Sequence, residues 1–346
     1  MISPEQASRF LQGLSRFASS TGVLRLFEWT RRSGLTILRM RLSPTSRDAA
    51  GDAWTAEMLT EALQLVAERY TVIPLRDAVA ALEGRQAMPE APLVLTASIT
   101  TPPGDFPLGR VLSAAKVQCF ISGSPTLLDR GQPPWPVLVR TALDRVSTDS
   151  VDFYERRWPI GGNGTREKVA KEIIGRLYAL PDTERHSRAI ELIGRWGVSA
   201  DTVRGIQWTD FERLANTDGV TVGASGLIGD SLLRQPADRA IWELRESRYR
   251  MSDRLGREIV YLEYPWGEMN PLLGIEAKRA GYVCGIGWST DSTAVLNPRD
   301  RDPFALISRP FYPGTREMTR AELAGLMTYL RPAVRFITRK RRKVAQ

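Results

Sequence analysis

The sequence predicts an α/β protein built as a distorted (β/α) barrel with a helical insertion. Along most of its 346 residues, short apolar runs alternate with amphipathic stretches, which is typical of βα units around a parallel sheet or barrel. Between about residues 133 and 209 only helical patterns remain, and the alternation then resumes. The chain has no internal repeat, so one large domain with an insertion accounts for its length.

The strands and helices before the insertion follow from local patterns. Strands are expected where short runs of leucine or β-branched residues occur, and helices where apolar residues recur at three- and four-residue spacing. A basic helical segment precedes the first strand. The expected strands are 35–40, 70–75, 93–96 and 117–122, and the expected helices are 55–68, 76–82 and 108–115.

The insertion and the second half of the barrel are predicted in the same way. Gly256 is expected to end a long helix, because glycine readily adopts the left-handed conformation of a helix end. Thr319 and Glu322 are expected to form a capping box at the start of the last helix. The expected helices are 140–145, 166–180, 183–195, 236–255, 271–280 and 319–329, and the expected strands are 219–224, 258–264, 282–286 and 304–307.

These elements divide the chain into consecutive parts. An N-terminal helical segment covers residues 1–33, and the barrel, with its insertion, covers 34–315. A C-terminal helix is expected over 316–338, followed by a basic tail at 339–346.

Charge and composition limit the classes of partner. The net charge of +9 comes mainly from arginine, and five consecutive basic residues occupy 339–343. Such a tail is typical of a solvated, disordered terminus, and the alternative is peripheral contact with an anionic membrane. No basic patch interleaved with aromatic residues accompanies it, so the sequence argues against nucleic acid as a partner.

Cysteine usage and the N-terminus predict a cytoplasmic protein. Cys119 and Cys284 each lie in an apolar run, which favours buried free thiols in a reducing compartment. The N-terminus shows no basic region followed by an apolar stretch, and no run of 18 apolar residues occurs.

The chain contains one histidine, His186, in a charged stretch that predicts a solvated helix face within the insertion. Histidine is the commonest metal ligand and the usual general base near neutral pH. A single histidine, placed in the insertion, argues against a histidine-based zinc site and against a nucleophilic triad with Ser98 or Ser225.

The strand ends carry a resemblance to a known family. The pattern consists of Thr-Val-Ile-Pro-Leu at 71–75, Gly-Val-Thr-Val-Gly-Ala at 219–224, Leu-Gly-Arg at 255–257, and Tyr264-Pro-Trp-Gly followed by Asn270. In order and spacing it resembles the NodB-type polysaccharide deacetylases, carbohydrate esterase family 4, especially the branch with a helical insertion. The resemblance covers roughly residues 30 to 315 and implies a zinc-dependent deacetylase barrel.

The positions that the resemblance assigns to catalysis hold other residues. The family has an aspartate pair, a general base and a metal ligand, where this chain has Ser98 and Ile99. It has two zinc-binding histidines where this chain has Ser225 and Gly229. Met40-Arg41-Leu42 stands where the family often has Tyr-His-Arg. A catalytic zinc needs three protein ligands and an open water position, so we expect the zinc site to be lost and no cofactor to replace it.

The sequence therefore predicts a catalytically inactive deacetylase-like protein. We expect it to bind an oligosaccharide, or a protein of polysaccharide and cell-envelope synthesis, through a groove at the strand ends. One alternative is a hydrolase of amide bonds with a rebuilt carboxylate site, although Asp105, Asp230, Glu263, Glu268 and Asp291 are best interpreted as solvated loop acids. Another is a non-enzymatic scaffold. The groove candidates are Arg41, Ser98, Ile99, Ser225, Gly229, Tyr264, Trp266 and Trp288.

Overall fold

Seven parallel strands close into a barrel in the computed structural model. Each strand pairs with its neighbours in the order β1-β10-β9-β8-β7-β4-β3, and β3 pairs back with β1. This arrangement confirms the predicted fold class. The structure describes residues 4–22, 24, 34–42, 54–100, 107–162, 165–288, 296–327 and 329–330. The barrel strands are β1 (Thr36–Arg41), β3 (Pro92–Ser98), β4 (Cys119–Gly123), β7 (Val220–Ala224), β8 (Tyr261–Glu263), β9 (Cys284–Trp288) and β10 (Leu306–Phe311), and a short β2 (Thr71–Val72) pairs beside β3.

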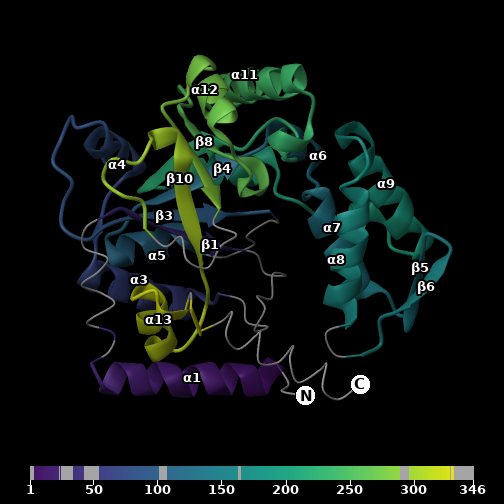
Figure 1. Ribbon diagram of the computed structural model, residues 1–346. Coiled ribbons are helices and arrows are strands. Elements are labelled where there is room, and N and C mark those ends of the chain that lie inside the picture. The colour runs from purple at the N-terminus through teal and green to yellow at the C-terminus, as the bar shows by residue number, and fades with distance from the viewer. Residues whose placement is uncertain are drawn as a thin grey trace.

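Helices cover the outside of the barrel, as Figure 1 shows. An N-terminal helix, α1, packs against α13 near the end of the chain and lies beneath the barrel in that view. The covering helices are α1 (Pro4–Ser20), α3 (Ala56–Arg69), α4 (Leu75–Leu82), α5 (Leu108–Ala115), α6 (Pro125–Arg130), α10 (Trp208–Ala215), α11 (Ala237–Leu255), α12 (Pro271–Arg279) and α13 (Arg316–Leu323). Short 3-10 turns occur at η2 (Leu232–Arg234), η3 (Pro265–Gly267) and η4 (Pro303–Ala305).

The segment between β4 and β7 forms a compact unit beside the barrel (Figure 1). Its helices enclose a hydrophobic cluster of their own, which includes Leu138, Ile173 and Leu192. A hairpin inside it was not predicted from sequence, because its turn places Tyr154 and Glu155 at positive φ without the glycine or asparagine that usually marks such a turn. The unit consists of α7 (Trp135–Arg145), β5 (Ser150–Phe153), β6 (Arg156–Pro159), α8 (Thr165–Leu177), α9 (Asp182–Arg195) and η1 (Ala200–Thr202).

The barrel interior changes character along its axis. Side chains alternate between the two faces of a strand. At the amino end the inward residues are apolar, with Ile37, Phe120 and Ile286 in one buried cluster. Two residues further along β1, the inward position is Arg39. Polar and aromatic groups therefore occupy the carboxyl end of the barrel, where this architecture places its functional residues.

The last helix differs from its prediction. Helix α13 begins after Thr315, whose side chain accepts a hydrogen bond from the amide of Met318 at 3.4 Å. Thr319 is buried inside the helix, so the predicted capping box of Thr319 and Glu322 is wrong. The earlier threonine also fits a cap, and packing of the first turn against α1 selected it.

The predictions for the two cysteines and for Gly256 are confirmed by the structure. Cys119 and Cys284 are buried free thiols, as expected. Gly256 adopts the left-handed conformation at the end of α11, as expected. Within the described residues, no helix combines the length and the apolar character needed to cross a membrane. The basic tail lies outside the described residues.

Candidate functional site: the carboxyl end of the barrel

We define the barrel mouth as the carboxyl ends of the barrel strands together with the described residues that follow them. At its floor lies Glu263 of β8, which is 4% exposed. Its Oε1 accepts a hydrogen bond from Trp288 Nε1 at 2.8 Å, and its Oε2 accepts one from the hydroxyl of Ser122 on β4. The carboxylate is therefore fixed by two donors from neighbouring strands and stays buried without a salt bridge among the described residues.

Arg39 lies beside this carboxylate. Its guanidinium carbon is 3.9 Å from the centroid of the Trp288 ring, which is the geometry of a cation–π contact. Burial lowers the pKa of Arg39 to about 10; attraction by Glu263 acts in the opposite direction, and repulsion by Arg41 lowers the pKa further. The guanidinium therefore remains charged near neutral pH.

Arg41 and Ser98 stand one layer further out, as register partners on β1 and β3. The side chain of Arg41 is exposed, yet its pKa is lowered, because the surrounding protein desolvates the guanidinium and Arg140 of α7 repels it. Glu167 of α8 partly offsets this effect, although it already pairs with Arg140. Arg41 is thus the candidate residue that faces the helical unit.

The four positions assigned to family catalysis lie along the β3–β4–β7 side of the mouth, with β4 between the other two strands. Ile99 is 7% exposed and belongs to the main apolar cluster. Gly229 has φ +67°, and a Cβ built on it would lie 2.6 Å from Leu127 Cδ1. Ser225 is held by its backbone, whose carbonyl accepts a hydrogen bond from the hydroxyl of Ser124 at 2.6 Å. A side chain at position 229 would therefore strain the backbone and displace the Leu127 side chain.

The β7–α11 loop is anchored by two carboxylates, of which Asp230 is buried and Glu268 is partly exposed. Asp230 is 2% exposed and forms an ion pair with Arg185 of α9 at 3.0 Å. It also accepts a hydrogen bond from Trp135 Nε1 at 3.3 Å. Glu268 receives the hydroxyl of Ser231 and a two-nitrogen contact from Arg234. The interpretation of Asp230 and Glu263 as solvated loop acids is wrong, because both are buried and bonded.

A third carboxylate, that of Glu243 on α11, forms hydrogen bonds with the backbone of the same loop. Its Oε2 accepts hydrogen bonds from the amides of Leu227 at 3.1 Å and Ile228 at 3.5 Å. Burial raises the pKa of Glu243 to about 6, and these two amides limit the rise. The loop that would carry the family's histidines is therefore fixed by its own backbone contacts.

The turn after β8 presents Trp266. This residue has φ +60°, an unusual conformation for a bulky side chain, and Gly267 follows it at φ +69°. Trp266 Nε1 donates to the Gly229 carbonyl at 3.0 Å, and its ring packs against Trp288 at 6.3 Å between centroids. Tyr264 is fully buried and donates its hydroxyl to the Phe304 carbonyl at 3.0 Å, so it supports the turn from inside.

The residues present do not fit the family's zinc. Position 99 is an apolar side chain and position 229 has none, so neither offers a donor atom. Among the residues that the structure describes, no group of three histidine, cysteine, aspartate or glutamate side chains is arranged to hold a metal ion. Asp105 and Asp291 lie outside the described residues.

The single histidine is not a solvated surface residue. His186 is half-buried on α9, and its Nε2 lies 2.9 Å from Gln132 Oε1. Burial lowers the pKa of His186 to about 4, and repulsion by Arg130 contributes. The expectation of a solvated helix face is wrong here, because this face of α9 packs toward the barrel.

Sequence reasoning missed Arg39, Ser122 and Arg185. A signal for Arg39 was present, since it follows Ile37 on the same face of a strand and so had to point into the barrel. Ser122 and Arg185 act through partners far away in sequence, Glu263 and Asp230, and carried no local signal.

Comparison with solved structures relates this geometry to known proteins. The deacetylase PplD of Streptococcus pyogenes, in complex with acetate, matches with a TM-score of 0.54 over 84% of this chain and 97% of that chain, at 9% identity. The chain has the fold of the NodB-type polysaccharide deacetylases. IcaB from Ammonifex degensii matches at 0.49 over 85% and 97%, with 14% identity. A polysaccharide deacetylase from Bacillus cereus matches at 0.47 over 84% and 69%, with 9% identity.

Sequence comparison does not extend this result. No protein-family model matches the chain, and comparison with curated proteins finds no relative. The likeness to these known proteins therefore rests on the fold alone.

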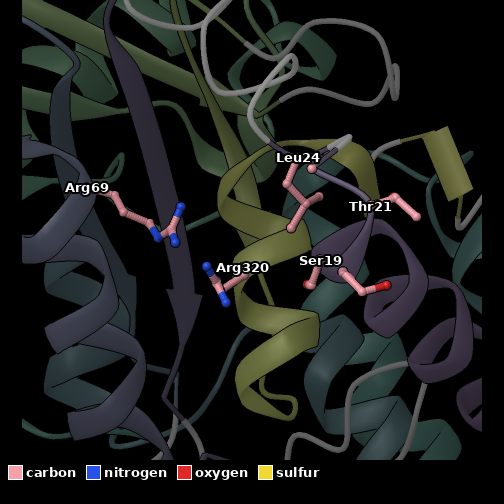
Figure 2. A pocket seen from close by; sticks show the side chains of 7 residues that line it. Ser19, Thr21, Leu24, Arg69 and Arg320 are labelled. Carbon is pink, nitrogen blue, oxygen red and sulfur yellow. The ribbon is translucent and has the colours of Figure 1, made fainter.

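A cavity of about 460 Å³ lies elsewhere, between the end of α1, the end of α3 and α13. Figure 2 shows Arg69 and Arg320 extending toward each other across it, with Ser19, Thr21 and Leu24 on the opposite wall. Arg69 is the last residue of α3, just before β2, so this cavity is at the amino end of the barrel. It is separate from the mouth.

Proposed function

We propose that this chain is a catalytically inactive protein of the deacetylase fold that binds a saccharide at the barrel mouth, in polysaccharide or cell-envelope metabolism. One observation carries the proposal: Gly229, where the resemblance places a zinc-binding histidine, has a left-handed backbone and crowded surroundings that disfavour a side chain. A Cβ there would lie 2.6 Å from Leu127 Cδ1 and 3.1 Å from Ser124 Oγ. Without zinc, water at the mouth keeps its high pKa, and hydrolysis of an acetamide lacks its nucleophile.

The aromatic residues support saccharide binding. Trp266 and Trp288 are both partly exposed and adjacent at the mouth. Trp266 is held in a left-handed conformation that bulky residues rarely adopt, at a cost of about 1–2 kcal/mol. Strain of this kind is concentrated at functional sites. The two indole rings form a surface on which a sugar ring can stack.

The first experiment measures acetate release and binding together. Purified protein with one equivalent of added zinc is incubated with N-acetylglucosamine oligomers, and acetate is assayed. We expect no release, and we expect the same oligomers to quench tryptophan fluorescence. Trp266→Gly removes the ring while suiting the backbone conformation, so it should abolish quenching without unfolding the protein. Acetate release that depends on added zinc contradicts the inactive assignment.

The rebuilt carboxylate site has less support. Asp230, Glu263 and Glu268 each bind a fixed donor, from Arg185, Trp288 and Arg234 respectively. A general base must be free to take a proton from water. Amide hydrolysis that is lost in Glu263→Gln would favour this alternative over the inactive protein.

Contact with an anionic membrane is favoured by one observation on α1. Phe10 and Phe17 are 52% and 64% exposed and lie seven residues apart, on one face of this helix. Arg16 is exposed beside them. An apolar and basic face of this kind binds the surface of an anionic bilayer. The wild-type protein should sediment together with phosphatidylserine vesicles. The double variant Phe10→Ser/Phe17→Ser should stay in the supernatant. Tyr249→Ser on α11 is the matched control and should sediment as the wild type does.

A further inference from the structure

Three arginines are buried within the described part of the chain, and the terminal guanidinium nitrogens of two of them are bonded in structural contacts. Arg309 on β10 is 3% exposed and donates to the carbonyls of Glu322 at 2.7 Å and Leu323 at 3.1 Å. Arg185 on α9 is also 3% exposed and binds Asp230 at 3.0 Å as well as two backbone carbonyls. Burial of a guanidinium is normally offset in this way, because each lost hydrogen bond to water must be replaced.

Arg39 is the exception. It is 8% exposed, and no described residue accepts a hydrogen bond from its guanidinium. Its Nε is completely buried. The stacking contact with Trp288 fixes the plane of the group without using any N–H donor. A charged, immobilised fork of donors therefore remains available at the floor of the mouth.

None of the described neighbouring charges is a hydrogen-bond or ion-pair partner of this donor group. Glu263 attracts Arg39 through space, but it is bonded to Trp288 and Ser122 and forms no ion pair with Arg39. Arg41 follows on the same face of β1, about 7 Å away, and forms no ion pair or hydrogen bond with the described residues. The charges that act on Arg39 thus include one carboxylate, which is already bonded to other donors, and a second guanidinium.

We propose that Arg39 and Arg41 bind the anionic group of an acidic saccharide, a carboxylate or a phosphate, while its ring stacks on Trp266. Guanidinium groups bind both anions through paired N–H donors. In this proposal the arginine pair supplies the positive charge of the site, as a metal ion does in a metal-dependent hydrolase. The proposal rests on the saccharide-binding function and adds the chemical class of the ligand.

The test compares acidic saccharides with their neutral counterparts by isothermal titration. The probes are trigalacturonic acid, its trimethyl ester, glucose 6-phosphate and glucose. We expect at least one acid to bind about tenfold or more tightly than its neutral counterpart. Binding of trigalacturonate alone identifies a carboxylate as the group recognised, and binding of glucose 6-phosphate alone identifies a phosphate. Raising the NaCl concentration should weaken the acidic ligand only.

Three arginine variants locate the site. Arg39→Met should weaken the acidic ligand about tenfold or more relative to its neutral counterpart, and Arg41→Met should weaken it about threefold because its charge is exposed. Arg245→Met, an exposed arginine on α11, is the matched control and should bind as the wild type does. If Arg39→Met fails to fold, the affinity of Arg41→Met for the acidic ligand, compared with that of Arg245→Met, tests the inference.

The possible outcomes distinguish a failure of this inference from a failure of the proposed saccharide-binding function. Equal affinity for trigalacturonate and its ester, with glucose 6-phosphate no better than glucose, overturns the inference and leaves neutral saccharide binding intact. Unchanged acidic binding in both Arg39→Met and Arg41→Met also overturns it. If no saccharide binds, including N-acetylglucosamine oligomers, both proposals fail.

Discussion

The two sides of the barrel mouth differ in whether their charged side chains are hydrogen-bonded to described residues. On the β7–β8 side, Asp230, Glu243 and Glu268 each meet an arginine, a backbone amide or a hydroxyl. On the β1 side, Arg39 and Arg41 form no hydrogen bond with any described residue. Carboxylates bonded in this way fix the structure around them, whereas guanidinium donors that no described residue uses are available to a ligand. The comparison separates what this mouth uses for folding from what it offers for binding.

The largest expected effect comes from breaking the ion pair on the β7–β8 side. Arg185→Met leaves Asp230 charged and buried, so the free energy of unfolding should fall by about 3–5 kcal/mol. Urea denaturation measures this change. Arg188→Met, on the exposed face of the same helix, should change it by less than about 0.5 kcal/mol. Adding Asp230→Asn to Arg185→Met should recover part of the loss, and no recovery would show that lost packing, not the uncompensated charge, is responsible.

The second prediction concerns Gly229, the position at which the resemblance places a histidine. Gly229→Ala should lower the free energy of unfolding by about 2–4 kcal/mol, because the backbone strain adds to the overlap with Leu127. Gly256→Ala is the matched control, since Gly256 has φ +61° with nothing within 4 Å of the added carbon, and it should cost only about 1 kcal/mol. Equal costs at the two glycines would mean that position 229 has room for a side chain.

A third prediction contrasts two buried arginines directly. Arg309→Met leaves two helix-end carbonyls and Glu322 without their donor, so it should cost about 2–4 kcal/mol. Arg39→Met removes a buried charge that forms no hydrogen bond with the described residues, and the free energy of unfolding should stay within about 1 kcal/mol of the wild type. The two variants, unfolded in urea side by side, should differ by about 2 kcal/mol. A large loss in Arg39→Met would assign that arginine a structural role.

The smallest effect is a pH dependence centred on His186. Its folded pKa, about 4, lies below the ordinary value of 6.5, so the unfolded chain binds more protons between these values. Stability should therefore be lost as the pH falls from 6.5 toward 4, by about 2 kcal/mol at pH 5. His186→Gln should remove this loss in thermal unfolding scans between pH 7.5 and 5.

Glu243 provides the opposite sign for comparison. Its folded pKa, about 6, lies above the ordinary value of 4.5, so its penalty is present above pH 6 and is relieved as the pH falls toward 4.5. Glu243→Gln should therefore gain stability relative to the wild type near pH 7.5 and lose that advantage by pH 4.5. The same sign of pH dependence in both variants would contradict these assignments.

Most of the fold could be predicted because its signals are local. Strands β1, β3, β4 and β7 follow from runs of apolar residues, and helices such as α3 and α11 follow from apolar spacing. The 150–159 hairpin could not be predicted, since its turn lacks the usual residues. The last helix was misplaced because two threonines four residues apart both fit a cap, and only the packing of α13 against α1 distinguishes them.

The sequence by itself determined which chemistry the family positions could no longer supply, because isoleucine at 99 and glycine at 229 lack donor atoms whatever the fold does with them. Only the tertiary structure decided that Asp230 and Glu263 are bonded and that no described residue accepts a hydrogen bond from Arg39. Their partners stand 45 and 141 residues away, at Arg185 and Ser122, and reach them only when the barrel closes. Whether a buried charge is satisfied depends on such distant groups, so residue types alone do not determine it.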